Sequence, residues 1–574
     1  MVVKLAKTAG FCMGVKRAVD IVLDRARSRE VETIYTYGPL IHNPQTIQIL
    51  KKRGIVPVDA VDDIAGGVII IRAHGISPDE REKIKSKGVR IIDATCPKVA
   101  HVQSIIKKHS SLGYTIVIVG DRTHPEVVGL LGYSSGRGLV VGSVDEVGEI
   151  PCDGPVCVVA QTTQNSETFA AIAARISERF PGAVIVNTVC DSTERRQSEV
   201  RALAGEMDAI IIVGGKNSAN TKQLASIARS RGAPTFHIET VEELAHINLD
   251  AYGKIGVSAG ASTPNWITDS VIDYLTHCHE KKGPRNLRDF YRLWIFLIQT
   301  DIYSALGAGC LAVASMFLQR MEVQPLSVLI ACFYVYAVHT INRLRERNFG
   351  RIQGSFREEL YVKRRQLFYG IAFACLVVAA ALSWMAGPAP FALLMLLAVL
   401  GVLYNITIFP AGWRLRRLSD IPGSKSVSIA LAWATITALL PQAGVSSSLT
   451  PATAVAFLFV WVLVFVKSTL DDMVDIQSDR LVGEETIPVL IGEGNTRRLL
   501  EGVSMAMGLI LVCSSFAGFT PGTSAAFVLC VIYVWICFML YDRKARFSSV
   551  VLEGLLGINY LLAGIISAVL PAVG

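Results

Sequence analysis

The chain has 574 residues, of which 51% are hydrophobic and 18% are charged, and its mean hydropathy is +0.43. This composition excludes an ordinary soluble enzyme of the same length, so part of the chain is expected in lipid. The net charge of +8 does not indicate a nucleic-acid partner, because much of the excess lies in short loops between apolar runs, where membrane topology accounts for it.

Residues 1–279 have the sequence pattern of an α/β domain. Short β-branched strands alternate there with helices, and examples are predicted at Val68–Ile71, Thr115–Val119, Val156–Val159 and Ala209–Val213. Cys12, Cys96 and Cys190 each stand before a helical segment at similar intervals, which indicates an internal repeat. We therefore predict three similar α/β units around one centre.

Several of these predicted strands run directly into polar turns. The turns after Val68–Ile71 and Thr115–Val119 contain His74 and His124, and Ala209–Val213 is followed by a Gly-rich polar segment. Ligands of open α/β sheets bind beyond the carboxyl ends of strands, against helix N-termini that favour anions. These turns are where we expect a diphosphate to be held.

The three cysteines are candidate metal ligands. Each lies at a turn among Gly, Pro, Thr or Asp, whereas a structural cysteine usually lies on an apolar face. Three thiolates suit a zinc site with an open position, and they equally suit a 4Fe-4S cluster with one iron that lacks a protein ligand. The residues alone leave both kinds of centre open.

A series of motifs runs in order through this region. They are Gly10–Val15, His42–Pro44, Ala73–Gly75, Asp93–Pro97, His124–Val127, Gln161–Thr163, Cys190, Lys216–Asn220 and Ala259–Pro264. Together they closely resemble the IspH/LytB family, the 4-hydroxy-3-methylbut-2-enyl diphosphate reductases. The resemblance implies the final step of the non-mevalonate isoprenoid pathway, with isopentenyl and dimethylallyl diphosphates as products.

The resemblance also implies roles for individual residues. By it, Cys12, Cys96 and Cys190 hold a 4Fe-4S cluster whose fourth iron binds the substrate hydroxyl, where an open metal position acts as a Lewis acid. The pocket for the diphosphate is then lined by His42, His74 and His124. Hydrogen bonds to phosphate oxygens come from Ser218, Asn220 and Ser262, which are suitable donors for such a group.

Glu126 is the candidate proton donor. Hydroxide is a poor leaving group, so a carboxylic acid is needed near the departing oxygen, and a partly buried Glu beside phosphate should have a raised pKa. We expect Thr162 to orient the hydroxyl and relay the proton. No nucleotide or flavin fingerprint is present, so electrons are expected from an external donor such as ferredoxin or flavodoxin.

Beyond a polar linker at residues 280–292, residues 293–574 are predicted to form a multi-pass membrane domain. About nine spans are expected, beginning near residues 294, 325, 367, 389, 427, 452, 499, 523 and 550. Lys and Arg gather in Arg343–Arg365, Arg414–Lys425 and Asp542–Arg546, while the alternate loops have none. The positive-inside rule places these basic loops, and the N-terminal domain, on the cytoplasmic side of the inner membrane. Met1–Gly10 lacks the apolar core of a signal peptide, in agreement with this orientation.

Asp472, Asp475 and Asp479 follow one another at helical spacings, so we expect them on one face at a cytoplasmic helix end. Such a face can bind Mg2+ and, through the metal, a diphosphate. These acids, with Tyr404, Thr486–Gly492 and the basic loop before them, resemble the UbiA family of intramembrane prenyltransferases.

One motif departs from the UbiA pattern. The family usually has an acidic motif after the second span, but the matching stretch here is Asn342–Gly350. In it Arg343 and Gly350 replace two of the acids, and Glu346 is the candidate replacement for another. A two-metal site is not expected from this stretch. The domain is then either a prenyltransferase that acts on a lipophilic acceptor or a non-catalytic membrane anchor or lipid-binding module, and we favour the first because the later acids persist.

Overall fold

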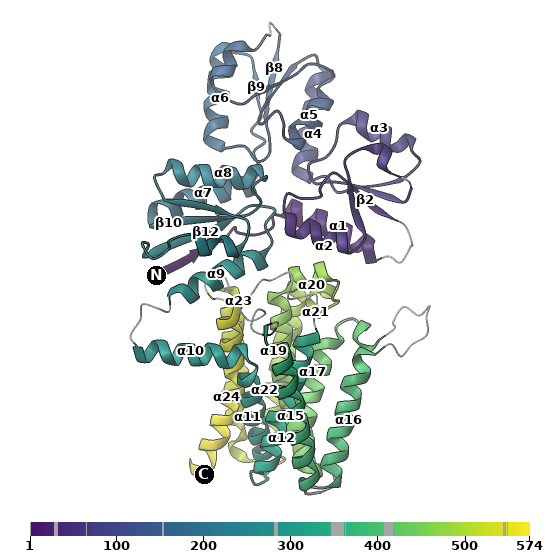
Figure 1. Ribbon diagram of the computed structural model, residues 1–574, viewed down its shortest axis with the longest axis vertical. Coiled ribbons are helices and arrows are strands. Elements are labelled where there is room, and N and C mark those ends of the chain that lie inside the picture. Colours follow the sequence, from purple (N-terminus) through teal and green to yellow (C-terminus); the bar gives the residue numbers. More distant parts are fainter. Residues whose placement is uncertain are drawn as a thin grey trace. The chain divides into compact units, whose positions relative to one another are not determined.

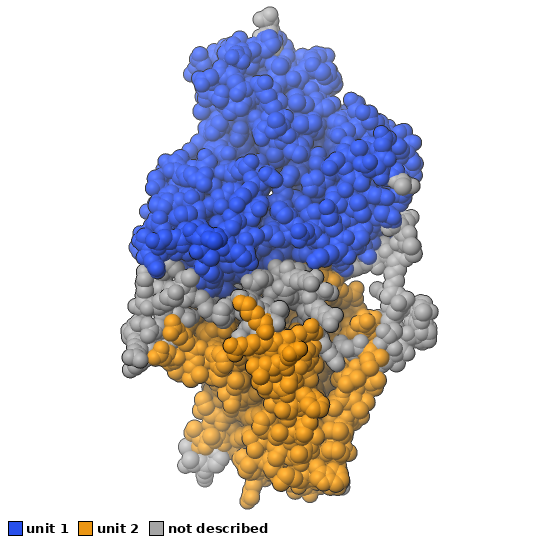
Figure 2. All heavy atoms as spheres, in the orientation of Figure 1, with its two compact units in different colours: residues 1–275 blue, residues 276–574 orange. Residues whose placement is uncertain are grey.

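The computed structural model of the chain describes most of its sequence. The described residues are 2–27, 33–64, 66–151, 154–279, 285–345, 361, 363–406, 417–446, 448–543, 547 and 549–573. The chain divides into two compact units, Met1–Leu275 and Thr276–Gly574, which Figure 2 shows in different colours. Each unit is described separately below.

The first unit contains three four-stranded parallel sheets. Their strands are β1 (Val2–Leu5), β2 (Ile34–Tyr37), β3 (Ile55–Val58), β4 (Val68–Ile71), β5 (Arg90–Asp93), β6 (Thr115–Val119), β7 (Gly138–Val141), β8 (Val156–Ala160), β9 (Val184–Ile185), β10 (Ala209–Val213), β11 (Thr235–Ile238) and β12 (Lys254–Ala259). The strand orders are β3-β2-β4-β5, β7-β6-β8-β9 and β11-β10-β12-β1. The prediction of an α/β domain with three similar units is therefore confirmed.

All three sheets have the same internal order. Apart from β1, the first strand of each sheet in the sequence has the second strand on one side and the third on its other side, and a fourth strand follows the third. In the last sheet the fourth place is taken by β1, whose Val2 and Leu5 pair with Lys254 and Val257 of β12. One central strand of each sheet is buried along its whole length: β4, β8 and β10. Continuous β-branched runs of this kind are typical of parallel strands covered on both faces.

The helices of the first unit connect these strands. They are α1 (Met13–Arg27), α2 (Pro44–Lys52), α3 (Pro78–Ser86), α4 (Pro97–Ser111), α5 (Pro125–Leu131), α6 (Ser166–Arg179), α7 (Asp191–Glu206), α8 (Ala219–Ser230) and α9 (Asn265–His279). Polar side chains cap several of them: Asn43 accepts the Thr46 N–H of α2 at 2.9 Å, and Ser77 and Glu80 form a capping box at α3. Such caps fix the start of each helix directly after a loop.

Helices α4 and α7 connect one sheet to the next. Helix α4 follows β5 of one sheet and packs against β6 and β8 of the next, while α7 follows β9 and packs against β10 and β12. Figure 1 shows the three α/β lobes, and α1 lies in the lobe that contains β2. The strand before α1, β1, belongs to a different sheet. The cysteine turns that precede these helices therefore lie where the chain passes between lobes.

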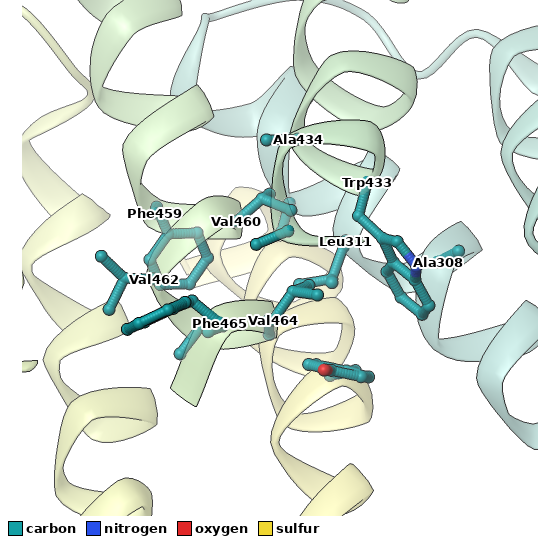
Figure 3. Close-up of a cluster of buried hydrophobic side chains, with 14 of the residues drawn as sticks. Ala308, Leu311, Trp433, Ala434, Phe459, Val460, Val462, Val464 and Phe465 are labelled. Carbon is teal, nitrogen blue, oxygen red and sulfur yellow. The ribbon is translucent and has the colours of Figure 1, made fainter. Parts of the chain in front are cut away.

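The second unit is helical. Its helices are α10 (Arg285–Gln299), α11 (Ile302–Leu318), α12 (Pro325–Arg345), α15 (Arg365–Ala386), α16 (Pro388–Asn405), α17 (Ser424–Ala434), α18 (Leu440–Ala443), α19 (Pro451–Val474), α20 (Ile476–Val482), α21 (Ile487–Ile491), α22 (Glu493–Phe516), α23 (Val528–Asp542) and α24 (Ser549–Val573), with a π-helical turn at Thr435–Leu439 between α17 and α18. Its core packs Leu311 of α11 and Trp433 of α17 with Phe459 of α19 (Figure 3). The C-terminal half is thus an apolar helical bundle.

Seven helices among the described residues are long and apolar enough to cross a membrane. They are Pro325–Leu344, Arg365–Ala386, Ser424–Ala443, Pro451–Val474, Glu493–Phe516, Gly522–Asp542 and Val550–Leu570. The span predicted near residue 294 consists of two helices, Asp289–Gln299 and Ile302–Leu318, bent by 81°, and it would be the eighth. The one predicted near residue 389 is a shorter apolar helix, Pro388–Tyr404. Nine full spans are therefore not reached, because hydropathy measures composition and does not detect a bend or a short helix.

Candidate functional site

The polar residues of the candidate site follow the two middle strands of each sheet. His42 and His74 come after β2 and β4, and Ser218 and Ser262 come after β10 and β12. In the remaining sheet, His124 with Glu126 follows β6, and Thr162 follows β8. In an open parallel sheet of this strand order, the loops after the two middle strands run in opposite directions. A crevice forms between these loops, and this position is the topological switch point where ligands bind. The three sheets therefore contribute equivalent crevices to one site.

His42, His74 and His124 lie together. Their ligating nitrogen atoms all fall within 4.8 Å of one another, and the ring centroids of His42 and His74 are 4.9 Å apart. Burial lowers the pKa of His124 to about 4 and holds that of His74 well below its usual range. At neutral pH the three rings are therefore uncharged, and each has one N–H donor and one acceptor nitrogen.

Several buried polar atoms around these rings have no hydrogen-bond partner among the described residues. They include Nε2 of His42, Nδ1 of His74 and both amide atoms of Asn220. Ser218 caps α8 through its hydroxyl oxygen, and the Ser262 hydroxyl donates to the His42 carbonyl at 3.2 Å. Because buried polar groups are normally paired, unpaired donors beside a helix N-terminus suit an anionic ligand.

Glu126 is buried in the first turn of α5, with 1% of its surface exposed. The Thr162 backbone N–H donates to its Oε1 at 2.7 Å, and the Thr162 hydroxyl donates to its Oε2 at 2.9 Å. Burial raises the pKa of Glu126 to about 7, although the two hydrogen bonds from Thr162 act in the opposite direction. The carboxyl group can therefore hold a proton near neutral pH, as a general acid must.

The three cysteines begin three helices. Cys96 and Cys190 are the N-cap residues of α4 and α7, and Cys12 directly precedes α1. All three are partly exposed. A helix N-terminus favours negative charge, so it can stabilise a thiolate once a metal binds it. Burial raises the pKa of the Cys96 thiol in the protein alone.

Each cysteine backbone is bound to one of the polar loops. The N–H of Cys12 donates to the Ala261 carbonyl at 3.0 Å, that of Cys96 to Ala73 at 2.9 Å, and that of Cys190 to Thr162 at 2.9 Å. Ala261 adjoins Ser262, and Ala73 adjoins His74. The cysteines and the polar side chains therefore belong to one site whose two parts are joined through the backbone.

Gly14 makes room for the cysteine sulfurs. A Cβ at this position would lie 2.6 Å from Sγ of Cys96 and 4.0 Å from Sγ of Cys12. Cys12 and Cys190 also both act electrostatically on Cys96. The space beside the thiols is thus kept free of side chains, which fits a metal centre bound by all three.

Gly14→Ala is expected to impair this centre. The added methyl group would overlap Sγ of Cys96, so we expect less metal to be bound at the three cysteines. Iron analysis and the visible spectrum after anaerobic purification test this. Gly148→Ala is the control, because nothing lies near its Cβ position; equal iron content in both variants would contradict the prediction.

In the second unit, Asp472, Asp475 and Asp479 do not lie on one helix as predicted. Helix α19 ends at Val474, Asp475 stands between α19 and α20, and Asp479 is buried in α20. The backbone leaves helical geometry at Asp475, where φ is −94° and ψ is 10°. Burial raises the pKa of Asp475 to about 7 and that of Asp479 to about 9.

These acids already have polar neighbours. The Ser426 hydroxyl donates to Oδ2 of Asp472 at 2.6 Å, and the Thr486 hydroxyl donates to Oδ2 of Asp479 at 3.2 Å. Their carboxylate oxygens are not among the groups of ligand atoms that lie within 4.8 Å of one another in the described part of the chain. A cation bound here would therefore have to draw the carboxylates together.

Sequence reasoning missed Asp471, which precedes Asp472 and accepts a hydrogen bond from Nζ of Lys467 at 2.6 Å. Asp471, Asp475 and Asp479 follow one another at intervals of four, and this spacing could have identified the residue. Tyr404, part of the predicted motif, shares a hydrogen bond with the Ser424 hydroxyl at 2.9 Å. The predicted acids therefore lie beside additional cationic and polar groups.

Arg343 forms a buried ion pair that the sequence did not indicate. Its Nη2 lies 2.9 Å from Oδ1 of Asp301, a carboxylate with 1% exposure, and the Tyr361 hydroxyl donates to Oδ2 of Asp301 at 2.8 Å. Asp301 has φ +60° and lies at the bend between α10 and α11. Glu346 and Gly350 lie outside the described residues.

Two family models match the chain: "LytB protein" over residues 3–276 and "UbiA prenyltransferase family" over residues 303–552. The 4-hydroxy-3-methylbut-2-enyl diphosphate reductase of Aquifex aeolicus is 42% identical over 270 residues, 46% of this chain and 93% of that protein. The protein of the same name from Geobacter sulfurreducens is 43% identical over 282 residues, 49% and 99% of the two chains. A solved UbiA homolog from Archaeoglobus fulgidus bound to GPP and Mg2+ is 15% identical with a TM-score of 0.37, covering 48% of this chain and 98% of that chain.

Proposed function

The chain belongs to the LytB family through its N-terminal half and has a UbiA prenyltransferase family domain in its C-terminal half, and from this premise we propose that it reductively removes the hydroxyl group of 4-hydroxy-3-methylbut-2-enyl diphosphate. One observation supports this proposal most directly. The three histidines lie together, the Glu126–Thr162 pair lies on neighbouring loops, and these loops are hydrogen-bonded to the turns that contain the cysteines. Such a site can hold a diphosphate beside a metal centre and a proton donor.

The reaction consumes two electrons and two protons and releases water, and the products are isopentenyl and dimethylallyl diphosphates. Neutral His42, His74 and His124 donate N–H groups to the diphosphate, together with Ser218, Asn220 and Ser262. Protonated Glu126 gives a proton to the departing hydroxyl oxygen, and Thr162, bonded to both carboxyl oxygens through its N–H and hydroxyl, holds the acid in place. Burial of both residues keeps bulk water from competing for this proton.

A 4Fe-4S cluster bound by Cys12, Cys96 and Cys190 would supply single electrons and an open iron position for the substrate oxygen. The space beside Gly14 fits this group. The same three thiolates could also hold a single zinc ion, and the metal content of the purified protein distinguishes the two centres.

The proposed arrangement of the chain is a reductase domain at residues 1–279, a linker at 280–292 and a membrane domain at 293–574. From Arg285 on, the predicted linker is helical, because it forms the start of α10. Electrons come from an external one-electron carrier such as ferredoxin or flavodoxin. The basic loops support an inner-membrane location with the reductase in the cytoplasm.

The test is to purify the full chain anaerobically and supply the hydroxylated diphosphate with a reduced one-electron carrier. We expect a brown protein with iron and sulfide that forms both five-carbon diphosphates. A colourless zinc protein, or a brown protein that leaves the substrate unchanged, would refute the reductase assignment.

For the membrane domain, we propose transfer of a prenyl group from its diphosphate to a lipophilic acceptor, with Mg2+ bound by Asp472, Asp475 and Asp479. The support is a set of buried carboxylates in an apolar bundle, with Lys425 paired to Glu484 at 3.2 Å and acting on all three acids. Buried acids cost stability unless a cation compensates them, so their presence indicates a function.

Asp475→Asn is expected to abolish prenyl transfer while leaving the reductase active. The full chain in detergent is incubated with Mg2+, prenyl diphosphates of several lengths and membrane lipid extract, and prenylated lipid is measured by mass spectrometry. Asp542→Asn is the matched control, because Asp542 is half-exposed and pairs with Arg497. Diphosphate binding without any product in the unaltered chain would favour the anchor or lipid-binding module instead.

A further inference from the structure

Arg196 is a buried arginine of α7, which begins at Cys190. Only 3% of its surface is exposed. Its Nη1 donates to the Ala259 carbonyl at 2.9 Å, and its Nη2 donates to the Gly10 carbonyl at 2.6 Å. Gly10 is two residues before Cys12, so the guanidinium connects the helix of one cysteine to the turn of another.

This guanidinium makes no ion pair within 4.0 Å among the residues the structure describes. The negative groups that act on it are, in order of strength, Cys12, Glu199 and Cys190. The Glu199 carboxylate accepts the backbone N–H groups of Lys7 at 2.6 Å and Thr8 at 2.9 Å and keeps its negative charge. Nε of Arg196 is buried and has no hydrogen-bond partner in the described part of the chain.

A buried cation is costly unless a negative group compensates it, and removing the compensation costs several kcal/mol. Two carbonyl oxygens satisfy part of the guanidinium's hydrogen bonding, but they carry no net charge. Glu199 offers part of the compensation, and Cys12 and Cys190 on the cysteine side offer the rest. The arginine is thus placed where thiolates and a bound cluster would supply the missing negative charge.

We propose that Arg196 is a positioning residue that supplies the counter-charge of the reduced iron-sulfur cluster and thereby raises its reduction potential. The inference rests on the proposed function, because it needs a cluster at the three cysteines. When the external carrier gives one electron to the cluster, the centre gains one negative charge. A fixed cation close by, in a medium of low dielectric, stabilises the reduced cluster more than the oxidised cluster. The reduction potential of the cluster is raised as a result.

The test compares the full chain with Arg196→Gln and Arg196→Lys, each purified anaerobically with its cluster. The midpoint potential is measured by redox titration monitored by electron paramagnetic resonance. Arg196→Gln removes the charge, so we expect a lower midpoint potential and a smaller reduced fraction at a fixed applied potential. Arg196→Lys keeps the charge, so its potential should remain near that of the unaltered chain.

Arg201→Gln is the matched control on the same helix. Arg201 is 18% exposed and pairs with Glu167 at 3.0 Å, so its loss should leave the potential unchanged. An unchanged potential in Arg196→Gln, or an equal fall in Arg196→Lys, would overturn the inference. If neither variant retains iron, Arg196 has a packing role and the inference also fails; if only Arg196→Lys retains it, the need for charge is supported. Absence of a cluster from the unaltered chain would instead overturn the proposed function itself.

Discussion

Glu126→Gln is expected to lower turnover of the hydroxylated diphosphate by about 10²–10⁴-fold while the visible spectrum of the cluster stays unchanged. The glutamine amide has nearly the same shape, and its oxygen can still accept the Thr162 N–H that now lies 2.7 Å from Oε1. It has no acidic proton to give to the departing oxygen. Turnover measured with a reduced one-electron carrier, beside an absorption spectrum, separates loss of chemistry from loss of the cluster.

The pH dependence gives the same residue a second signature. Burial raises the pKa of Glu126 to about 7, so the acid is protonated below that pH and loses its proton as the pH rises through it. Turnover should therefore fall above about pH 7, and the residual turnover of Glu126→Gln should lack this fall. Glu82→Gln is the control, since Glu82 is exposed and pairs only with Lys85 in the contacts described. Equal activity of Glu126→Gln and the unaltered chain would rule out the proton-donor role.

Cys96→Ala is expected to remove the cluster and reduce reductase activity to background. The substitution takes away the ligand at the N-cap of α4, and a cluster bound by two of its three thiolates should be lost or degraded. Iron and sulfide analysis, with the same activity assay, measures the effect. The prenyl-transfer activity proposed for the membrane domain should persist, because that domain forms a separate compact unit.

Cys157→Ala is the matched control for this prediction. Cys157 is fully buried in the apolar strand β8, and burial raises the pKa of its thiol to about 11, so it behaves as a small apolar residue. We expect full iron content in this variant. Equal iron loss in both variants would mean that instability, and not loss of a ligand, explains the Cys96 result.

The sequence drew attention to the residues of the N-terminal site because they lie in local motifs, while the chemistry assigned to them came from the family resemblance. The three cysteines, the three histidines and Glu126 each stand in a turn after a strand, where spacing and residue type are informative. The strand order was not predictable in this way. Val2 of β1 pairs with Lys254 of β12, so the two ends of the domain lie side by side. No local sequence pattern predicts a contact between residues so far apart in the chain.

Buried charges were the other feature that the sequence did not reveal. Arg196 lies in the polar segment Asp191–Glu206, which looks like a solvent-exposed helix, yet it is buried at the cysteine turns. Asp301 lies between two apolar runs and has a left-handed backbone conformation. Composition and periodicity do not reveal an ion pair with a residue on another helix. They also do not reveal a bend within an apolar segment, and for that reason the predicted number of spans was too high.

The place of β1 has a consequence for the order in which the protein matures. Because β1 completes its sheet only by pairing with β12, Cys12 cannot reach its final place until residue 259 has left the ribosome. Domains fold during synthesis in order of emergence, so the lobes that contain β2 and β6 can form first and the cysteine site is completed last. A cluster bound as proposed would therefore gain all three of its ligands only after β12 has been synthesised.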